Sequence, residues 1–516
     1  MHMEHVDVLV VGAGISGIGA GYHLKTRCPN RSFAIFEARP DLGGTWDLFR
    51  YPGIRSDSDM YTLGFSFRPW RSPKAIADGP SILAYLRETV AEHGLAPHIR
   101  YRRRVRRADW QSAEARWVVE YEEGEAGEVR QISCGFLHMC AGYYDYGRGH
   151  RPRFADEETF RGRIVHPQFW PEDLDHAGKK VVVIGSGATA VTLVPELAKT
   201  AAQVTMLQRS PTYVVSRPAE DALANRLRAL LPATLAYQLI RWRNVLFGLY
   251  FFRLARRRPD QTKAALIDMV RRQLGEDFDV ETHFTPHYNP WDQRLCLVPD
   301  GDLFTALKSG RAQVVTDQIT RFTPTGIELA SGKSLEADII VTATGLELQL
   351  MSGLEARVDG APVSFPDAFS YKGMMYSGVP NLASSFGYTN ASWTLKADLT
   401  SAFLCRLLNH MAARGYQVCT PVADGPIEPT PWLDFTSGYV QRALGRLPRQ
   451  GTKAPWRVYQ NYLLDLLAFR FGRIEDGVLR FSHAERGDPP RKPSARRSQA
   501  QASGQLQGRE RTLADA

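Results

Sequence analysis

Cysteine is scarce in this sequence, and its spacing suits neither a disulfide framework nor a metal site. The 516 residues include six cysteines, with no CxxC pair. Disulfide-rich secreted domains and structural zinc sites both need cysteines in close groups. We therefore expect no metal, and we expect the protein in a reducing compartment, the cytoplasm.

Long apolar runs and an export leader are also missing. The best candidate for a membrane helix, residues 244–252, is about half as long as a bilayer crossing and is flanked by arginines. The first residues lead directly into an apolar stretch, without a basic region or a cleavage site. The sequence thus predicts neither a spanning helix nor export.

Positive charge is concentrated in one segment. The chain has a net charge of +9, and residues 206–273 hold 13 Lys and Arg against 4 Asp and Glu, an excess equal to that of the whole chain. Such a segment is typical of peripheral contact with an anionic membrane surface, or of the solvated face of ordinary helices. A second basic run, residues 100–107, alternates around Val105 as a strand with one solvated face does. We therefore expect no nucleic-acid partner.

The first glycine fingerprint follows an apolar run at the amino terminus. In Gly12-x-Gly14-x-x-Gly17, the first glycine allows a tight turn, the second lets a pyrophosphate approach the backbone, and the third lets helix pack on strand. The next apolar run, SFAIFE, ends in Glu37, whose carboxylate suits ribose hydroxyls and repels a 2′-phosphate. This unit is predicted to bind an unphosphorylated adenosine such as that of FAD.

The second fingerprint repeats the pattern with one relaxation. Gly185-x-Gly187-x-x-Ala190 has alanine at the third position. The next apolar run ends in Gln208, Arg209 and Ser210 in place of an acid. The guanidinium of Arg209 suits a 2′-phosphate, and the Ser210 hydroxyl adds a contact. This unit is predicted to bind NADPH in preference to NADH.

Together the fingerprints predict an α/β fold with two Rossmann-like dinucleotide-binding domains and a helical insertion. Residues 337–345, ADIIVTATG, indicate another buried strand ending in a glycine turn, at a chain crossing between the domains. The predicted division is an FAD-binding domain in two parts (1–145 and 336–484), a linker (146–180), an NADP-binding domain (181–335, with the insertion at about 220–275) and a disordered basic tail (485–516).

Two longer motifs narrow the choice of family. The first comprises Phe160, Gly162, His166, Trp170 and Pro171, and the second runs from Gly44-x-Trp46 through Tyr51-Pro52-Gly53 to Asp57. On these motifs the chain resembles the type I Baeyer–Villiger monooxygenases, which are class B flavoprotein monooxygenases, from about Val6 to about Ile474. Within that family it is similar to the ethionamide-activating enzymes of mycobacteria.

The resemblance implies a reaction and the residues that serve it. In the family, NADPH reduces FAD, dioxygen adds to give a C4a-peroxyflavin, and ketones become esters or lactones; sulfur in thioamides or sulfides is also oxidised. By position, Arg294 would stabilise developing negative charge, Asp57 would orient it, and His166 would lie in the moving linker. The other cofactor-binding positions implied are Ser16, Gly44, Thr45, Trp46, Arg55, Ser56, Val105, Ser186, Ala188 and Thr189.

One departure and three alternatives accompany this interpretation. Gln293 stands where many relatives carry a lysine that helps bind the 2′-phosphate, so Arg209 would carry more of that discrimination. A heteroatom oxygenase without Baeyer–Villiger activity shares the same cofactors. An FAD-dependent disulfide reductase needs a redox cysteine pair, which the spacing does not show. A non-catalytic protein acting through its basic helices would leave both fingerprints without a purpose. We expect a small ketone or sulfur-containing substrate and molecular oxygen as partners.

Overall fold

The larger sheet carries the first glycine fingerprint. In the computed structural model, which describes residues 3–433 and 435–484, its strands follow the order β20-β19-β4-β5-β6-β1-β2-β3, and β23 also pairs with β6. The strands are β1 (His5–Val11), β2 (Phe33–Phe36), β3 (Ile99–Arg100), β4 (Arg103–Gln111), β5 (Arg116–Glu123), β6 (Glu128–Met139), β19 (Glu355–Val358), β20 (Ala361–Pro362) and β23 (Leu382–Ser384). β1 pairs in parallel with β2 and β6, whereas β4 and β5 form an antiparallel extension.

The smaller sheet carries the second fingerprint and is parallel throughout, in the order β13-β10-β9-β17-β8. Its strands are β8 (Arg163–Val165), β9 (Lys180–Ile184), β10 (Gln203–Gln208), β13 (Ala312–Thr316) and β17 (Ile339–Thr342). One face packs on α5 (Ala188–Leu197) and α10 (Asp302–Lys308), and the other on the antiparallel strands β14 (Ile319–Thr323), β15 (Gly326–Leu329) and β16 (Ser334–Glu336). Cover on both faces explains the continuous apolar runs. The predicted α/β fold with two Rossmann-like units is confirmed.

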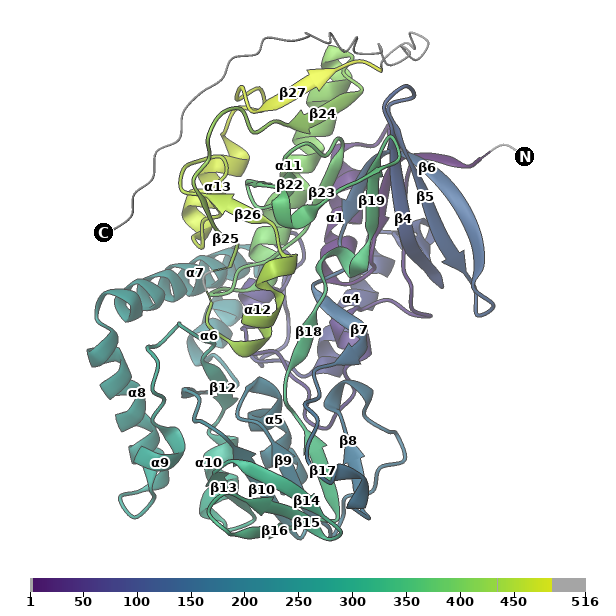
Figure 1. Cartoon of the computed structure of the whole chain (residues 1–516). Helices are drawn as coiled ribbons and strands as arrows, with labels where there is room; N and C mark the ends of the chain where they lie inside the picture. Colours follow the sequence, from purple (N-terminus) through teal and green to yellow (C-terminus); the bar gives the residue numbers. More distant parts are fainter. Residues whose placement is uncertain (1–2, 434, 485–516) are drawn as a thin grey trace, which may run out of the picture.

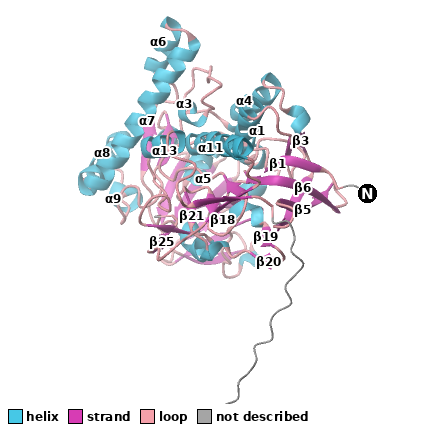
Figure 2. Ribbon diagram, turned by 90° about the horizontal axis from the view of Figure 1, so that it is seen from above, coloured by secondary structure: helices cyan, strands magenta, loops and turns pink. Residues whose placement is uncertain are grey.

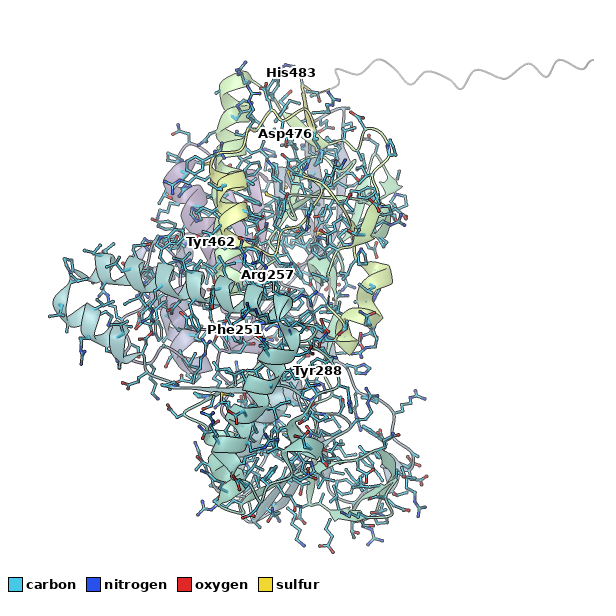
Figure 3. The ribbon with its side chains drawn as sticks, turned by 90° about the vertical axis from the view of Figure 1, so that its left-hand side faces the viewer. Phe251, Arg257, Tyr288, Tyr462, Asp476 and His483 are labelled. Carbon is cyan, nitrogen blue, oxygen red and sulfur yellow. The ribbon has the colours of Figure 1, made fainter. Side chains whose placement is uncertain are left out.

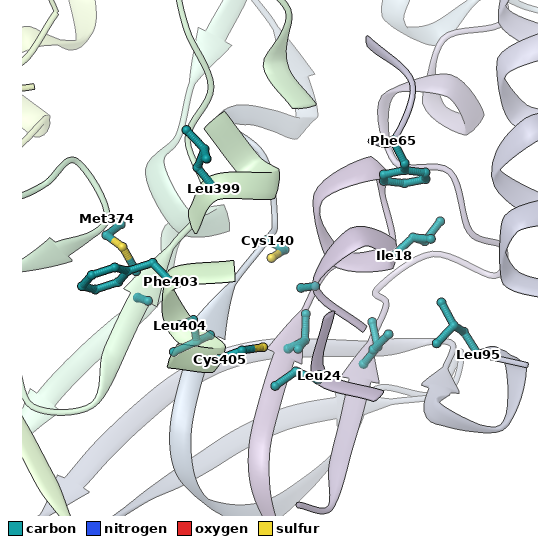
Figure 4. Packing of buried hydrophobic residues seen from close by; sticks show 14 of the residues in the cluster. Ile18, Leu24, Phe65, Leu95, Cys140, Met374, Leu399, Phe403, Leu404 and Cys405 are labelled. Atoms are coloured by element: carbon teal, nitrogen blue, oxygen red, sulfur yellow. The ribbon is translucent and has the colours of Figure 1, made fainter. Parts of the chain in front are cut away.

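The largest hydrophobic core lies beside the larger sheet, between α1 (Ile15–Arg27) and α11 (Trp393–Arg414). Figure 4 shows Ile18 and Leu24 of α1 and Leu404 and Cys405 of α11 converging in this core. The helix α4 (Gly79–Glu92) adds Ile82 and Leu86. Helix α11 lies more than 300 residues after α1 in the chain, so this core fixes the carboxyl-terminal part against the first fingerprint.

A helical segment projects from one side of the molecule. It comprises α6 (Ala222–Leu230), α7 (Ala233–Arg257), α8 (Pro259–Leu274) and the short α9 (Val280–Phe284). Figure 1 shows α7 and α8 standing out from the body of the fold, and Figure 2 shows α6 doing so as well. Among the residues that the structure describes, no helix has both the length and the apolar character that a membrane crossing requires.

The two sheets are joined by a narrow ribbon. Strands β7 (Tyr144–Gly149) and β18 (Leu346–Leu348) pair antiparallel where the chain passes between them (Figure 1). At the end of the ribbon, His150 Nδ1 lies 3.0 Å from Glu347 Oε1. The domain boundaries placed around these crossings stay a prediction, and the basic tail at 485–516 lies outside the described residues.

Smaller elements complete the described chain. The helices are α2 (Thr45–Leu48), α3 (Met60–Leu63), α12 (Gly438–Ala443) and α13 (Tyr462–Arg470). The paired strands are β11 (Val214–Arg217) with β12 (Cys296–Pro299), β21 (Ser370–Tyr371) with β22 (Met375–Tyr376), β24 (Val418–Pro421) with β27 (Leu479–Ser482), and β25 (Pro429–Pro431) with β26 (Arg449–Gly451). The basic run at 100–107 falls on β3 and β4, with Val105 buried and its neighbours Arg104 and Arg106 exposed.

Candidate active site

A cavity of about 1110 Å³ lies between the two sheets. The ends of β1, β2, β9 and β10 reach it, which is where ligands bind in open α/β sheets. The predicted site residues that line it are Gly12, Gly14, Ser16, Glu37, Gly44, Thr45, Trp46, Arg55, Ser56, Asp57, Val105, Gly185, Ser186, Gly187, Ala188, Thr189, Arg209, Ser210 and Arg294. Two fingerprints that are distant in the sequence therefore face the same cavity.

The first turn needs glycine at two positions for different reasons. Gly12 has a φ of +105°, and a Cβ there would lie 2.6 Å from the Cys140 carbonyl oxygen. Gly17 lies behind the turn, and a Cβ on it would lie 1.7 Å from the Gly12 carbonyl oxygen. Helix α1 begins at Gly14 without a side-chain cap or an acid in its first turn. Its first N–H groups are thus left for an anion.

The second turn repeats this geometry. Gly185 has a φ of +138°, and a Cβ there would lie 2.4 Å from the Ala343 carbonyl oxygen. Helix α5 begins at Gly187, also without a side-chain cap, and a Cβ on Gly187 would meet nothing within 4 Å. By contrast, α3, α4 and α6 begin at aspartates whose carboxylates accept backbone N–H groups. The uncapped starts of α1 and α5, which both lie at the cavity, can therefore receive a phosphate.

The strands that follow the two turns end in side chains of opposite charge. Glu37 is buried, and its carboxylate accepts hydrogen bonds from the backbone N–H groups of Ala13 (2.7 Å) and Arg39 (2.9 Å). Burial raises the pKa of Glu37, and these two bonds oppose the rise. At the other unit, Arg209 is exposed at the cavity and forms no ion pair with any described residue. The carboxylate is fixed in place, and the guanidinium is free.

An ion pair joins the two predicted catalytic residues. Arg294 Nη1 donates to Asp57 Oδ2 at 3.0 Å, and both side chains are 36% exposed, toward the cavity. Tyr143 and Tyr144 stand beside them, with their hydroxyl oxygens 2.6 Å apart. Burial raises the pKa of Tyr143 to about 12, although the charge of Arg294 lowers it. The tyrosines therefore stay neutral, and Arg294 is the local positive charge at neutral pH.

The loop before Asp57 holds the other predicted residues of the second motif. Thr45 and Trp46 form the start of α2, and a Cβ on Gly44 would lie 3.0 Å from the Cα of Gly14, so this loop touches the first turn. Arg55 forms an ion pair with Asp302 at the start of α10. Ser56 is buried, and its hydroxyl accepts a hydrogen bond from the Ser58 N–H at 3.0 Å. The loop thus bridges the two nucleotide units.

The residues of the first long motif lie away from the cavity lining. Phe160 is buried against Phe322, with their ring centroids 6.3 Å apart. A Cβ on Gly162 would lie 2.2 Å from the Asp338 carbonyl oxygen, just before β17. These contacts join the linker to the smaller sheet.

The second half of that motif lies at the joining ribbon. A Cβ on Gly149, at the end of β7, would fall 2.0 Å from the His166 ring, so this ring packs directly against the ribbon. Burial lowers the pKa of His166, and its Nε2 is buried without a hydrogen-bond partner among the described residues. Trp170 packs beside the core of the smaller sheet, and the Pro171 carbonyl accepts from the Leu174 N–H at 3.3 Å. The position fits a joint between sheets better than a proton-transfer base.

Several cavity residues were missed by sequence reasoning. Tyr143, Trp393, Phe435 and Tyr439 line the same space. Trp393 stacks on Tyr143 at 4.9 Å, and its indole N–H donates to the Ser16 hydroxyl at 2.7 Å. Because the partners are remote in sequence, no local spacing reveals them.

The structure also brings the Cys28 and Cys405 thiols together, but in the buried core between α1 and α11, away from the cavity lining.

Comparisons with known proteins agree with this geometry. Residues 70–247 match the flavin-binding monooxygenase-like family, and residues 10–73 match the NAD(P)-binding Rossmann-like domain. The chain is 55% identical over 483 residues to the FAD-containing monooxygenase EthA of Mycobacterium tuberculosis, covering 93% of this chain and 98% of EthA. It is 53% identical over 481 residues to EthA of Mycolicibacterium smegmatis, covering 93% and 97%.

Solved structures share the architecture. Oxidized steroid monooxygenase bound to NADP matches with a TM-score of 0.69 and 25% identity, over 81% of this chain and 88% of that one. Cyclohexanone monooxygenase from Rhodococcus sp. Phi1, bound to NADP+, matches with a TM-score of 0.72 over 94% and 100%; at 19% identity this likeness shows the fold alone. On its identity to EthA over nearly the whole of both chains, the protein belongs to the FAD-containing monooxygenase family.

Proposed function

We propose that this protein is an FAD- and NADPH-dependent monooxygenase that converts ketones to esters or lactones and also oxidises sulfur in thioamides or sulfides. The observation that carries this proposal is the Arg294–Asp57 pair in a cavity shared by two uncapped glycine turns. Bound FAD would supply the activation of dioxygen, and bound NADPH would supply the hydride.

The first unit fits FAD. The carboxylate of Glu37 already accepts two backbone N–H groups, and each of its oxygens keeps a lone pair for a ribose hydroxyl. The start of α1 offers unpaired N–H groups to a pyrophosphate. The backbones of Gly14 and Gly44 lie so close together that a side chain at Gly44 would fill the space between them.

The second unit fits NADPH. A side chain on Gly187 would enter the open space where the pyrophosphate would lie. Arg209 projects at the cavity without a carboxylate partner among the described residues, as a 2′-phosphate contact requires. We propose that Arg209 selects NADPH and that Ser210 adds a hydroxyl contact.

Arg294 and the aromatic side chains that line the cavity would act on the substrate. Attack on a ketone carbonyl places negative charge on the carbonyl oxygen, and a fixed guanidinium beside it stabilises that charge. Asp57 holds this guanidinium in position. Tyr143, Trp393 and Phe435 supply apolar surface around it, which suits a carbon-rich substrate with one polar group.

The test is an Arg294→Ala variant assayed with ¹⁸O₂, NADPH, a ketone panel and a sulfide panel. We expect one ¹⁸O atom in each product of the parent enzyme, and a loss of about 100- to 1000-fold in the ester or lactone from the variant. Flavin content and NADPH oxidation should persist. Arg311→Ala, at an exposed arginine outside the cavity, is the matched control. Normal ester formation by Arg294→Ala contradicts the assigned role, and sulfoxide without ester from the parent enzyme identifies a heteroatom oxygenase instead.

A further inference from the structure

Helix α7 packs an inward face of apolar residues and one arginine against the fold. Its inward face carries Arg241, which is 4% exposed and donates to the backbone carbonyls of Tyr61 (2.7 Å) and Gly64 (2.8 Å). The guanidinium also lies 4.0 Å from the buried Asp398. A buried arginine with this many partners anchors the helix firmly against the fold. The outward face is therefore held in a fixed orientation.

That outward face is apolar. Leu235, Leu239, Trp242, Leu246 and Tyr250 recur every three or four residues along α7 and are 38% to 64% exposed. This spacing places them in one stripe along the helix. A surface helix normally presents charged or polar residues to water, so a continuous exposed stripe indicates a contact surface.

Two neighbouring helices extend the stripe. Leu464 and Leu467 on α13, and Phe471 directly after it, are 44% to 69% exposed. This helix begins against α7, where the ring centroids of Tyr462 and Trp242 lie 5.9 Å apart. On α6, Leu223 and Leu230 are 51% and 74% exposed. Figure 3 looks onto this side, with α13 above α7 and Tyr462 at their junction. We call the exposed residues of α6, α7 and α13 the helical face.

The charge of the helical face is of one sign. Residues 222–257 contain no aspartate or glutamate and carry arginines at 226, 228, 241, 243, 253, 256 and 257. Arg226, Arg253 and Arg257 are exposed and form no ion pair with any described residue. Two copies of such a face would bring these arginines together and repel each other. An anionic surface is complementary instead.

We propose that the helical face docks on an anionic lipid surface, with its leucines and aromatic rings in the interfacial layer and its arginines on the phosphate groups. An interfacial helix needs an apolar stripe, flanking arginines and no acids, and α7 has all three. Docking of this kind needs no spanning helix. It is independent of the proposed reaction, because the helical face binds lipid without turnover.

The same helix links this surface to the site. On its inward side Val245 packs with Tyr388, which lines the cavity, and Asn244 donates to Asp59 at 2.9 Å, two residues after Asp57. A protein docked through α7 would thus hold one wall of the cavity next to the lipid. This placement suits substrates that partition into a membrane.

Vesicle co-sedimentation of the full chain tests the proposal. Phosphatidylcholine vesicles are compared with vesicles that also contain phosphatidylglycerol. We expect binding to the anionic vesicles and its loss at high salt. Leu239→Ser with Leu246→Ser should weaken partitioning about tenfold per leucine, and Arg253→Gln with Arg257→Gln about fivefold per arginine.

Matched controls change exposed residues away from the helical face. Val129→Ser, on β6, is the apolar control, and Arg311→Gln is the charge control; neither should alter binding. Because the substituted side chains are exposed, Tm should not change, and unchanged Tm separates lost docking from lost folding. Equal binding to both vesicle types overturns the proposal. A second result would also overturn it: the parent chain does not bind vesicles but forms a concentration-dependent dimer, and Leu239→Ser with Leu246→Ser dissociates this dimer.

Discussion

The two nucleotide-binding units have glycine turns of the same outline, and they differ in the third position of the fingerprint and in the charge at the end of the next strand. In each, the first glycine packs under a carbonyl of a neighbouring strand end, Cys140 in one and Ala343 in the other. The fifth residue after it is Gly17 in the first turn and Ala190 in the second. Ala190 is fully buried, so α5 stands far enough from its turn to admit a methyl group, whereas α1 does not. The first unit is packed more tightly.

The second difference concerns charge. The first unit presents a buried, hydrogen-bonded carboxylate, and the second presents a free guanidinium. Fixed acceptors suit two ribose hydroxyls that must be held in one geometry. A guanidinium without an ion-pair partner suits a phosphate, which it can bind through two parallel hydrogen bonds. The comparison teaches that two turns of the same shape can present opposite charges to their ligands.

Gly17→Ala should have the largest effect. A Cβ at Gly17 would lie 1.7 Å from the Gly12 carbonyl oxygen, so α1 must move away from the turn. We expect the free energy of unfolding to fall by about 3 kcal/mol and flavin content to fall below about a tenth of the parent value. Thermal melting and the absorbance of bound flavin measure the two effects. A yellow, normally stable variant would contradict the tight packing of the first unit.

Glu37→Gln should have the next largest effect. Glutamine keeps the size but has one oxygen where the carboxylate has two, so it cannot accept from Ala13, Arg39 and both ribose hydroxyls. Loss of charge-assisted hydrogen bonds of about 1.5 to 3 kcal/mol predicts a rise of at least tenfold in the Kd for FAD. Flavin fluorescence titration of the apoprotein measures it. The KM for NADPH should not change, because the second unit is intact.

The sequence predicted the parts of the fold that depend on local pattern. Both fingerprints, the carboxylate at Glu37 and the cation at Arg209 follow from spacing within one turn and one strand, so the sequence alone could predict them, and Glu37 and Arg209 line the cavity. Contacts between remote segments were not. Trp393 forms a hydrogen bond with Ser16, 377 residues away, and Arg55 forms an ion pair with Asp302, 247 residues away. The periodicity of a sequence does not indicate such partners. Periodicity also failed to show that α7 buries Arg241 and exposes its leucines, because amphipathic spacing does not say which face is covered.

Arg209→Ala should have a smaller, selective effect. Removal of a guanidinium that contacts the 2′-phosphate predicts a rise of about tenfold to 100-fold in the KM for NADPH. NADH lacks this phosphate, so its KM should hardly change. Steady-state kinetics with both coenzymes measure the ratio, and Arg311→Ala supplies the comparison. An equal rise for both coenzymes would show that another group reads the 2′-phosphate.

Ala190→Gly should have the smallest effect and is the sharpest test of the difference in packing. The second turn has room for the methyl group, so its removal relieves nothing and only adds backbone freedom within α5. Glycine in a helix interior costs about 1 kcal/mol relative to alanine, so we expect a slightly lower Tm with flavin content and the KM for NADPH unchanged. Tighter NADPH binding by Ala190→Gly would instead show that the methyl group of Ala190 strains α5 against its turn. Gly17→Ala is expected to strain α1 in the same way. The two turns would then differ in sequence but not in packing, because the methyl group of Ala190 would already be in tight contact with its turn.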